Sequence, residues 1–166
     1  RVQFKTGSLF RLEGNLTPAF SNRTYANFEL NYASAIITVT GTNAVSIDNL
    51  TITAGILNFN MTSTPGHSIK GNISVIAGAT LAFSPASTGT VNLNGSSLQS
   101  IGNFSTSSNS TLVFNNSNGF NLNGNVTIGG TLNLTSGLLN LGANNLTLSS
   151  ASSISGTPTA SNMIVA

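Results

Sequence analysis

A short motif returns through this chain about every twenty residues, and no other feature of the sequence restricts the fold as much. Each copy begins with Asn, continues with alternating apolar and hydroxyl residues, and leads through a small residue to a second apolar stretch. The copies begin at Asn49, Asn72, Asn103, Asn125 and Asn145, so the intervals are 23, 31, 22 and 20 residues. A repeat of this length is typical of solenoids, in which each unit buries its apolar face against its neighbours.

A second element with the same alternation runs into several of these copies. Residues 91–95, 120–124 and 139–142 each alternate apolar and polar side chains and then reach Gly. Such alternation is the period of a β-strand, and no stretch keeps the 3.6-residue spacing of an amphipathic helix long enough to form one. The sequence therefore predicts an all-β chain.

A β-sandwich would also have short strands and frequent turns, but recurring chemistry at equivalent positions favours a solenoid. The second apolar stretches end on large residues, namely Phe59, Phe83, Phe114, Leu134 and Leu148. Coils stacked about 4.8 Å apart would place these side chains in one column of the core. We therefore predict a right-handed parallel β-helix of about seven coils, with Asn and Gly at its corners and a loop excursion in the 31-residue interval.

The first third of the chain follows the rhythm less well, because Pro18, Tyr25, Tyr32 and most of the charges interrupt it. We expect residues 1–35 to form one or more less regular coils or a cap, and residues 36–166 to form the repeats. The chain starts at Arg1 without a signal peptide and ends on an apolar run. We therefore expect both ends to be cuts through a longer polypeptide.

Charged residues make up only 5% of the chain, against about 25% in a typical domain, so Ser, Thr, Asn and Gly must form most of the polar surface. The five basic residues form no cluster that could neutralise a run of phosphates, and we predict no nucleic-acid partner. No apolar run approaches the roughly 20 residues of a membrane span. The chain has no Cys, which removes disulfides and thiolate metal sites.

A repetitive, low-complexity pattern of short strand-like segments occupies residues 130–148 and recurs at 154–156 and 161–165. It resembles the repetitive β-strand regions of very large surface proteins from Bacteroidetes, which are exported by type IX secretion and often act as adhesins or in gliding. The resemblance implies an extracellular location at the bacterial cell surface. The partners that we expect are neighbouring coils of the parent chain, and also surface glycans or the secretion and surface machinery.

Asn-x-Ser/Thr sequons are unusually dense. Twelve occur, at Asn15, Asn22, Asn49, Asn60, Asn72, Asn94, Asn103, Asn109, Asn115, Asn125, Asn133 and Asn145. They are candidate glycosylation sites in a secreted protein. Every motif anchor is itself a sequon, however, because a corner Asn followed by an apolar and a hydroxyl residue suits the coil. We favour this structural interpretation.

The chemistry of an enzyme is not evident. Polysaccharide lyases and glycosidases need clustered carboxylates, whereas Glu13, Glu29 and Asp48 are far apart in the sequence. His67, the single histidine, lies in an expected loop, and we predict an exposed residue without a catalytic partner. We predict no catalytic residue, no cofactor and no metal site.

Four functions stay open. A spacer or display rod with an adhesive surface, as part of a secreted bacterial surface protein, agrees best with the composition and the resemblance. Carbohydrate binding by the exposed Asn, Thr and Ser side chains is the alternative, and a polysaccharide-active β-helix is a weaker one. Ice binding needs paired Thr residues in successive coils; the pairs 38–40 and 51–53 have this spacing, but later copies do not keep it.

Overall fold

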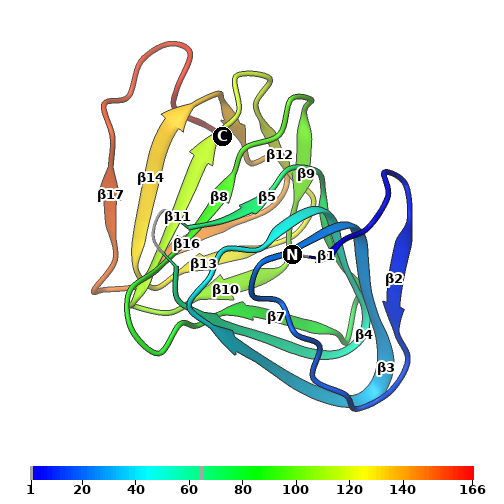
Figure 1. Ribbon diagram of the computed structural model, residues 1–166. Helices are drawn as coiled ribbons and strands as arrows, with labels where there is room; N and C mark the ends of the chain where they lie inside the picture. The colour runs from blue at the N-terminus through cyan, green and yellow to red at the C-terminus, as the bar shows by residue number, and fades with distance from the viewer. Residues whose placement is uncertain (1, 64–65) are drawn as a thin grey trace.

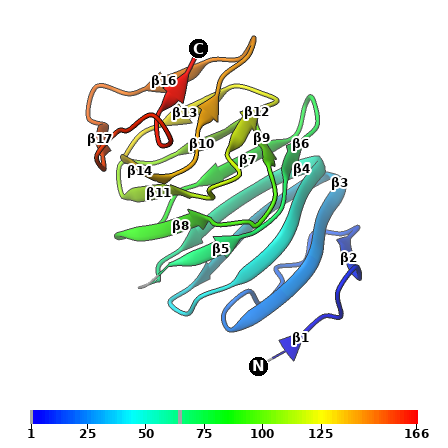
Figure 2. The same cartoon turned by 90° about the horizontal axis from the view of Figure 1, so that it is seen from above.

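The structure, a computed structural model, describes residues 2–63 and 66–166. The chain winds as a right-handed parallel β-helix of about seven turns, with a roughly triangular outline when seen along the stack (Figure 1). Its two termini lie at opposite ends of the stack (Figure 2). The predicted fold class is therefore confirmed.

The strands are short except for β3 and β4. In chain order they are β1 (Val2–Gln3), β2 (Leu9–Leu12), β3 (Arg23–Gly41), β4 (Ser46–Met61), β5 (His67–Ile69), β6 (Ile73–Val75), β7 (Thr80–Phe83), β8 (Gly89–Leu93), β9 (Gln99–Ile101), β10 (Phe104–Thr106), β11 (Ser110–Asn115), β12 (Phe120–Leu122), β13 (Val126–Ile128), β14 (Thr131–Ser136), β15 (Leu139–Asn140), β16 (Leu146–Leu148), β17 (Ser153–Ser155) and β18 (Ile164–Val165).

Three faces surround the core. Face A contains β1, the first part of β3 and β4, and then β5, β8, β11, β14 and β17. Face B contains β2, the middle of β3 and β4, and then β6, β9, β12, β15 and β18. Face C contains the last part of β3 and β4, followed by β7, β10, β13 and β16. All pairings between these strands are parallel, because each coil repeats the direction of the coil before it.

The long strands β3 and β4 continue around all three faces, whereas the later coils break at each corner. The corner between β5 and β6 holds Gly71, and that between β8 and β9 holds Gly95 and two Ser residues. One corner of β4 needs glycine for two reasons. Gly55 has a φ of 88°, and a Cβ there would lie 2.5 Å from the Tyr32 carbonyl oxygen.

The motif anchors occupy two different corners, which the sequence did not reveal. Asn27 pairs with Asn49, and Leu50 pairs with Ile73, so the anchors up to Asn72 lie where face A meets face B. Phe104 pairs instead with Leu81, which places the anchors from Asn103 onward at the start of face C. The 31-residue interval thus contains an added turn at 94–98 and also a change of face, so the expected loop accounts for only part of it.

We expected a single core column, but the structure contains two, one in face C and one in face A. Phe59 and Phe83 stand on each other in face C, with ring centroids 5.5 Å apart. Phe114 and Leu134 stand on each other in face A, and the Phe114 ring packs edge-on against Phe120 at 4.6 Å. These four core residues are buried.

The prediction that Leu148 is a core residue is wrong. Leu148 is 38% exposed, because it lies on β16, the last strand of face C in the stack. No further coil covers it among the described residues. An inward side chain at the end of the stack lacks the cover that a following coil would give it.

The predicted boundary between residues 35 and 36 falls inside β3, which runs from Arg23 to Gly41. The regular coils begin at Arg23. Before that point β1 and β2 pair with β3, and the aromatic rings of Phe4, Phe10 and Phe20 gather around Tyr25 at centroid distances of 4.9 to 5.4 Å. Ring packing thus holds an incomplete first coil on the stack.

Truncation of a buried column residue tests this assignment. Phe114→Ala should lower the free energy of unfolding by about 3 to 5 kcal/mol, because it leaves a cavity between Leu93 and Leu134. Leu148→Ala, at the exposed end, should cost only about 1 kcal/mol or less. Urea unfolding of the two variants measures both values, and a loss below about 1 kcal/mol for Phe114→Ala would contradict the column.

Candidate functional site

The corner between faces A and B is lined by an asparagine ladder, formed by Asn27, Asn49 and Asn72. The Asn49 amide nitrogen donates to Asn27 Oδ1 at 2.8 Å, and the Asn72 backbone N–H donates to Asn49 Oδ1 at 2.8 Å. The Ser100 backbone N–H extends the ladder to Asn72 Oδ1, also at 2.8 Å. These amides satisfy backbone groups that leave the strand pairing at the corner.

The same corner contains two buried amides further along the stack. Gln99 is 1% exposed, and its Nε2 donates to the carbonyls of Ile69 and Gly71. Its Oε1 accepts from the Asn116 side chain at 3.1 Å. Sequence analysis missed both residues, and the only available signal was a polar residue at an expected inward position.

The twelve sequons lie at the surface. Asn15, Asn22, Asn72, Asn103, Asn109, Asn115, Asn125 and Asn145 are exposed, and Asn49, Asn60, Asn94 and Asn133 are half-buried. The amide nitrogens of Asn49, Asn94 and Asn109, to which a glycan would be joined, already donate hydrogen bonds within the protein. For these three residues the contacts support the structural interpretation.

Replacing a ladder asparagine tests its structural role. Asn49→Ala removes the donor to Asn27 and the acceptor of the Asn72 N–H, so it should lower the free energy of unfolding by about 1 to 3 kcal/mol. Asn115→Ala is the matched control, because this exposed sequon has no side-chain hydrogen bond among the described residues and should change stability by about 0.5 kcal/mol or less. Equal losses in chemical denaturation would contradict the ladder.

Two carboxylates lie closer together than their sequence positions suggest. The Arg11 Nε donates to Glu29 at 2.8 Å, and the Arg11 guanidinium lies 3.6 Å from Glu13. Hydrogen bonds from Thr53 and then from Arg11 lower the pKa of Glu29. The matching triplets at 10–12 and 28–30, each with a charge between two apolar residues, were a signal for this pairing.

His67 is buried, which corrects the expectation of an exposed loop residue. It begins β5, is 1% exposed, and packs edge-on against the Phe59 ring at 5.0 Å. Its Nδ1 accepts a hydrogen bond from the Val45 backbone N–H at 3.3 Å. It occupies an inward position in the same row as Val45 and Val91, so alternation within β5 turns it into the core.

The burial of His67 makes stability depend on pH. Burial lowers the pKa of His67 below its ordinary value, and the Met61 backbone carbonyl opposes this only in part. As the pH falls below about 6.5 the unfolded chain takes up a proton that the folded chain refuses, so the free energy of unfolding should fall. Unfolding measured at about pH 7.5 and about pH 5.5 should show this loss in the natural chain and much less of it in His67→Gln. An equal loss in both proteins would contradict it.

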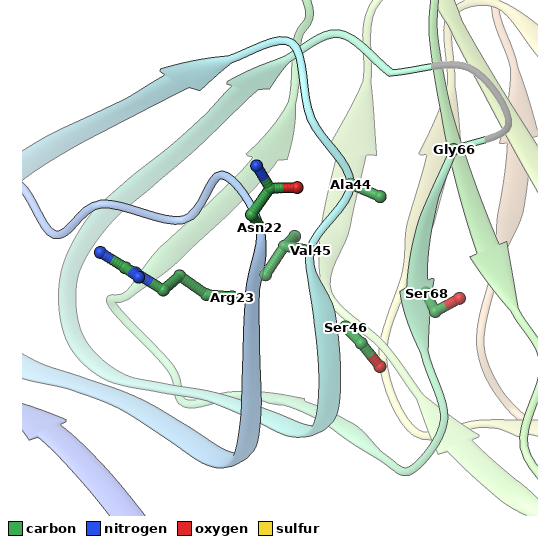
Figure 3. Close-up of a pocket in the computed structure, with 7 residues that line it drawn as sticks. All are labelled: Asn22, Arg23, Ala44, Val45, Ser46, Gly66 and Ser68. Atoms are coloured by element: carbon green, nitrogen blue, oxygen red, sulfur yellow. The ribbon is translucent and has the colours of Figure 1, made fainter. Parts of the chain in front are cut away.

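Several shallow hollows lie on the described surface, and two of them cross three coils. One of about 220 Å³ lies on face A and is lined by residues from three coils, among them Asn22, Ser46 and Ser68 (Figure 3). In Figure 3 the Ser46 and Ser68 hydroxyls point to one side, whereas the Arg23 side chain extends away from them. The Ser68 Oγ already accepts from Asn94 at 3.1 Å.

A second hollow of about 250 Å³, here called the face C trough, crosses three coils. Its polar lining residues are Thr80, Asn103, Ser105, Asn125 and Thr127. Thr80 lies on β7, Asn103 and Ser105 on or next to β10, and Asn125 and Thr127 on or next to β13. The trough therefore presents hydroxyl and amide groups at the spacing of the coils.

Within the described residues there is no group of three or more His, Cys, Asp or Glu side chains that could hold a metal ion. Nor does this part of the chain contain a helix long and apolar enough to cross a membrane. Comparison with protein-family models, with curated proteins and with solved structures finds no match to this chain.

Proposed function

We propose that this chain is a non-enzymatic structural and adhesive segment of a secreted bacterial surface protein. The observation that supports this best is the outer surface of face C, which has neutral polar side chains in successive coils. The row in register through the stack is Thr38, Asn58, Ala82, Ser105, Thr127 and Thr147. A long uncharged surface on a parallel stack suits a rod that makes many weak polar contacts.

The distribution of charge agrees with this proposal. Arg11 and Glu29 pair on face B, and Asp48 and Lys70 lie near the corner between faces A and B. The resemblance of residues 130–148 to Bacteroidetes surface proteins supports the cell-surface location and type IX export.

Carbohydrate binding is the alternative that the same surface favours. Ice binding has less support, because the outward pair Thr38 and Thr40 is followed by Asn58 and Asn60 rather than by a second Thr pair. The other pair, at 51–53, lies on face B.

A polysaccharide-active enzyme is the weakest alternative. A glycosidase requires a carboxylic acid with a raised pKa to protonate the leaving group. The pKa of Glu29 is lowered instead, and its carboxylate is bound by Thr53 and Arg11. This geometry supports a surface ion pair.

Adhesion and catalysis can be separated in one set of measurements. Beads coated with the full chain should be retained under flow on glycan-coated surfaces better than beads coated with an unrelated globular protein. The same chain, incubated with soluble polysaccharides, should release no new reducing ends or unsaturated products. Products would contradict the non-enzymatic proposal, and silence on a glycan array would leave the spacer role alone.

A further inference from the structure

We propose that the face C trough is a binding site for a neutral polysaccharide chain that lies along the stack. This inference rests on the adhesive part of the proposed function and assigns it to one face and one class of ligand. The trough spans three coils, from Thr80 through Asn103 to Asn125.

The polar groups of the trough are available to a ligand. The side chains of Thr80, Asn103, Ser105 and Thr127 make no hydrogen bond within the described residues, and Asn125 uses only its Oδ1, which accepts from the Asn145 N–H. The asparagine ladder at the other corner is different, since Asn49 there uses both atoms of its amide within the protein. Hydroxyls and amides without a protein partner can donate to and accept from sugar hydroxyls.

The lining also limits the charge of the ligand. None of the residues that line the trough is charged, and neither is any member of the outward row from Thr38 to Thr147. An acidic polysaccharide would find no cation here to offset the loss of water around its carboxylates. A neutral polysaccharide has no carboxylates, so its binding does not carry this cost of removing water.

The spacing between coils indicates that the polysaccharide lies along the axis of the stack. Successive coils are about 4.8 Å apart, which is comparable to the length of one sugar ring in an extended β-linked chain. A polysaccharide along the axis would therefore meet an equivalent hydroxyl or amide at each ring. Beyond the trough, the row that contains Thr80 continues into Ile56 and Ile36, and Ile36 is 65% exposed. These side chains offer an apolar surface to the C–H face of a ring.

The hollow on face A is a poorer site for such a chain. Its Ser68 hydroxyl is engaged by Asn94, and Arg23 on its edge is charged. The observations therefore favour face C.

The proposal is tested by measuring how the full chain binds to immobilised polysaccharides. Those used are β-1,4- and β-1,3-linked glucans, a β-1,4-linked mannan and alginate. The double variant Thr80→Ala/Thr127→Ala should weaken binding to a neutral polysaccharide by roughly twofold to tenfold per hydroxyl. Ser105→Ile, which fills the trough with an apolar side chain suited to a strand, should weaken it further. The matched control is Thr90→Ala/Thr111→Ala, which removes two hydroxyls from the outer side of face A.

Thermal unfolding of each variant shows whether its fold is intact. Among the described residues, the removed Thr hydroxyls have no hydrogen-bond partner whose loss would destabilise the protein. Loss of binding in the face C variants with retention in the face A control supports the site. Binding that falls equally in both, or that persists in Ser105→Ile, overturns the face C site and leaves adhesion elsewhere on the rod. Preference for alginate, or no binding to any of these polysaccharides, overturns the proposal while leaving the spacer role intact.

Discussion

Parallel hydrogen bonds between the backbones of successive coils hold this molecule together, and the other features follow from that pairing. Because each coil runs in the same direction as the one before, a residue in a paired strand stands on an equivalent residue of the next coil. An inward position therefore becomes a column, as with Ile47, Ile69 and Leu93 on face A. A polar residue in a column needs a partner, and Thr106, which stands on Phe83, accepts a hydrogen bond from the Gly129 N–H.

The corners are the places where the pairing fails, and amide side chains replace it there. Asn27, Asn49 and Asn72 bond to one another, and buried Gln99 and Asn116 continue this role where the chain turns more widely. An amide suits a corner because it supplies a donor and an acceptor on a short side chain. The high Asn content is thus explained in large part by the architecture.

The outward side chains of the faces differ from the corner amides, because few of them are needed for hydrogen bonds between the coils. On face C the polar side chains point away from the core, and within the described residues Asn125 is the one trough side chain that accepts a hydrogen bond from the protein, from the Asn145 N–H. Their arrangement is a by-product of the same stacking, since one outward position becomes one outward row. Apart from Ala82, the row from Thr38 to Thr147 consists of neutral hydroxyls and amides, which a repeated neutral ligand could match, and the proposed adhesive role rests on this surface.

The sequence by itself determined the strand period, the all-β class, the stacking of coils and the burial of Phe59, Phe83, Phe114 and Leu134. These follow from local alternation and from the length of the repeat, which any solenoid must satisfy. Only the tertiary structure decided which face each copy of the motif occupies. The same Asn-anchored alternation can begin face B or face C, because both are strands that follow a corner.

Burial also depended on position in the stack as well as on residue type. Leu148 has the same alternation as Phe83 but lies on the last strand of its face, and His67 is polar but stands in an inward row. The meeting of Arg11 with Glu29 likewise required the register of β2 on β3. Side-chain alternation says which residues share a side of a strand, but the neighbour across the hydrogen bonds is decided by how many residues each turn of the coil contains.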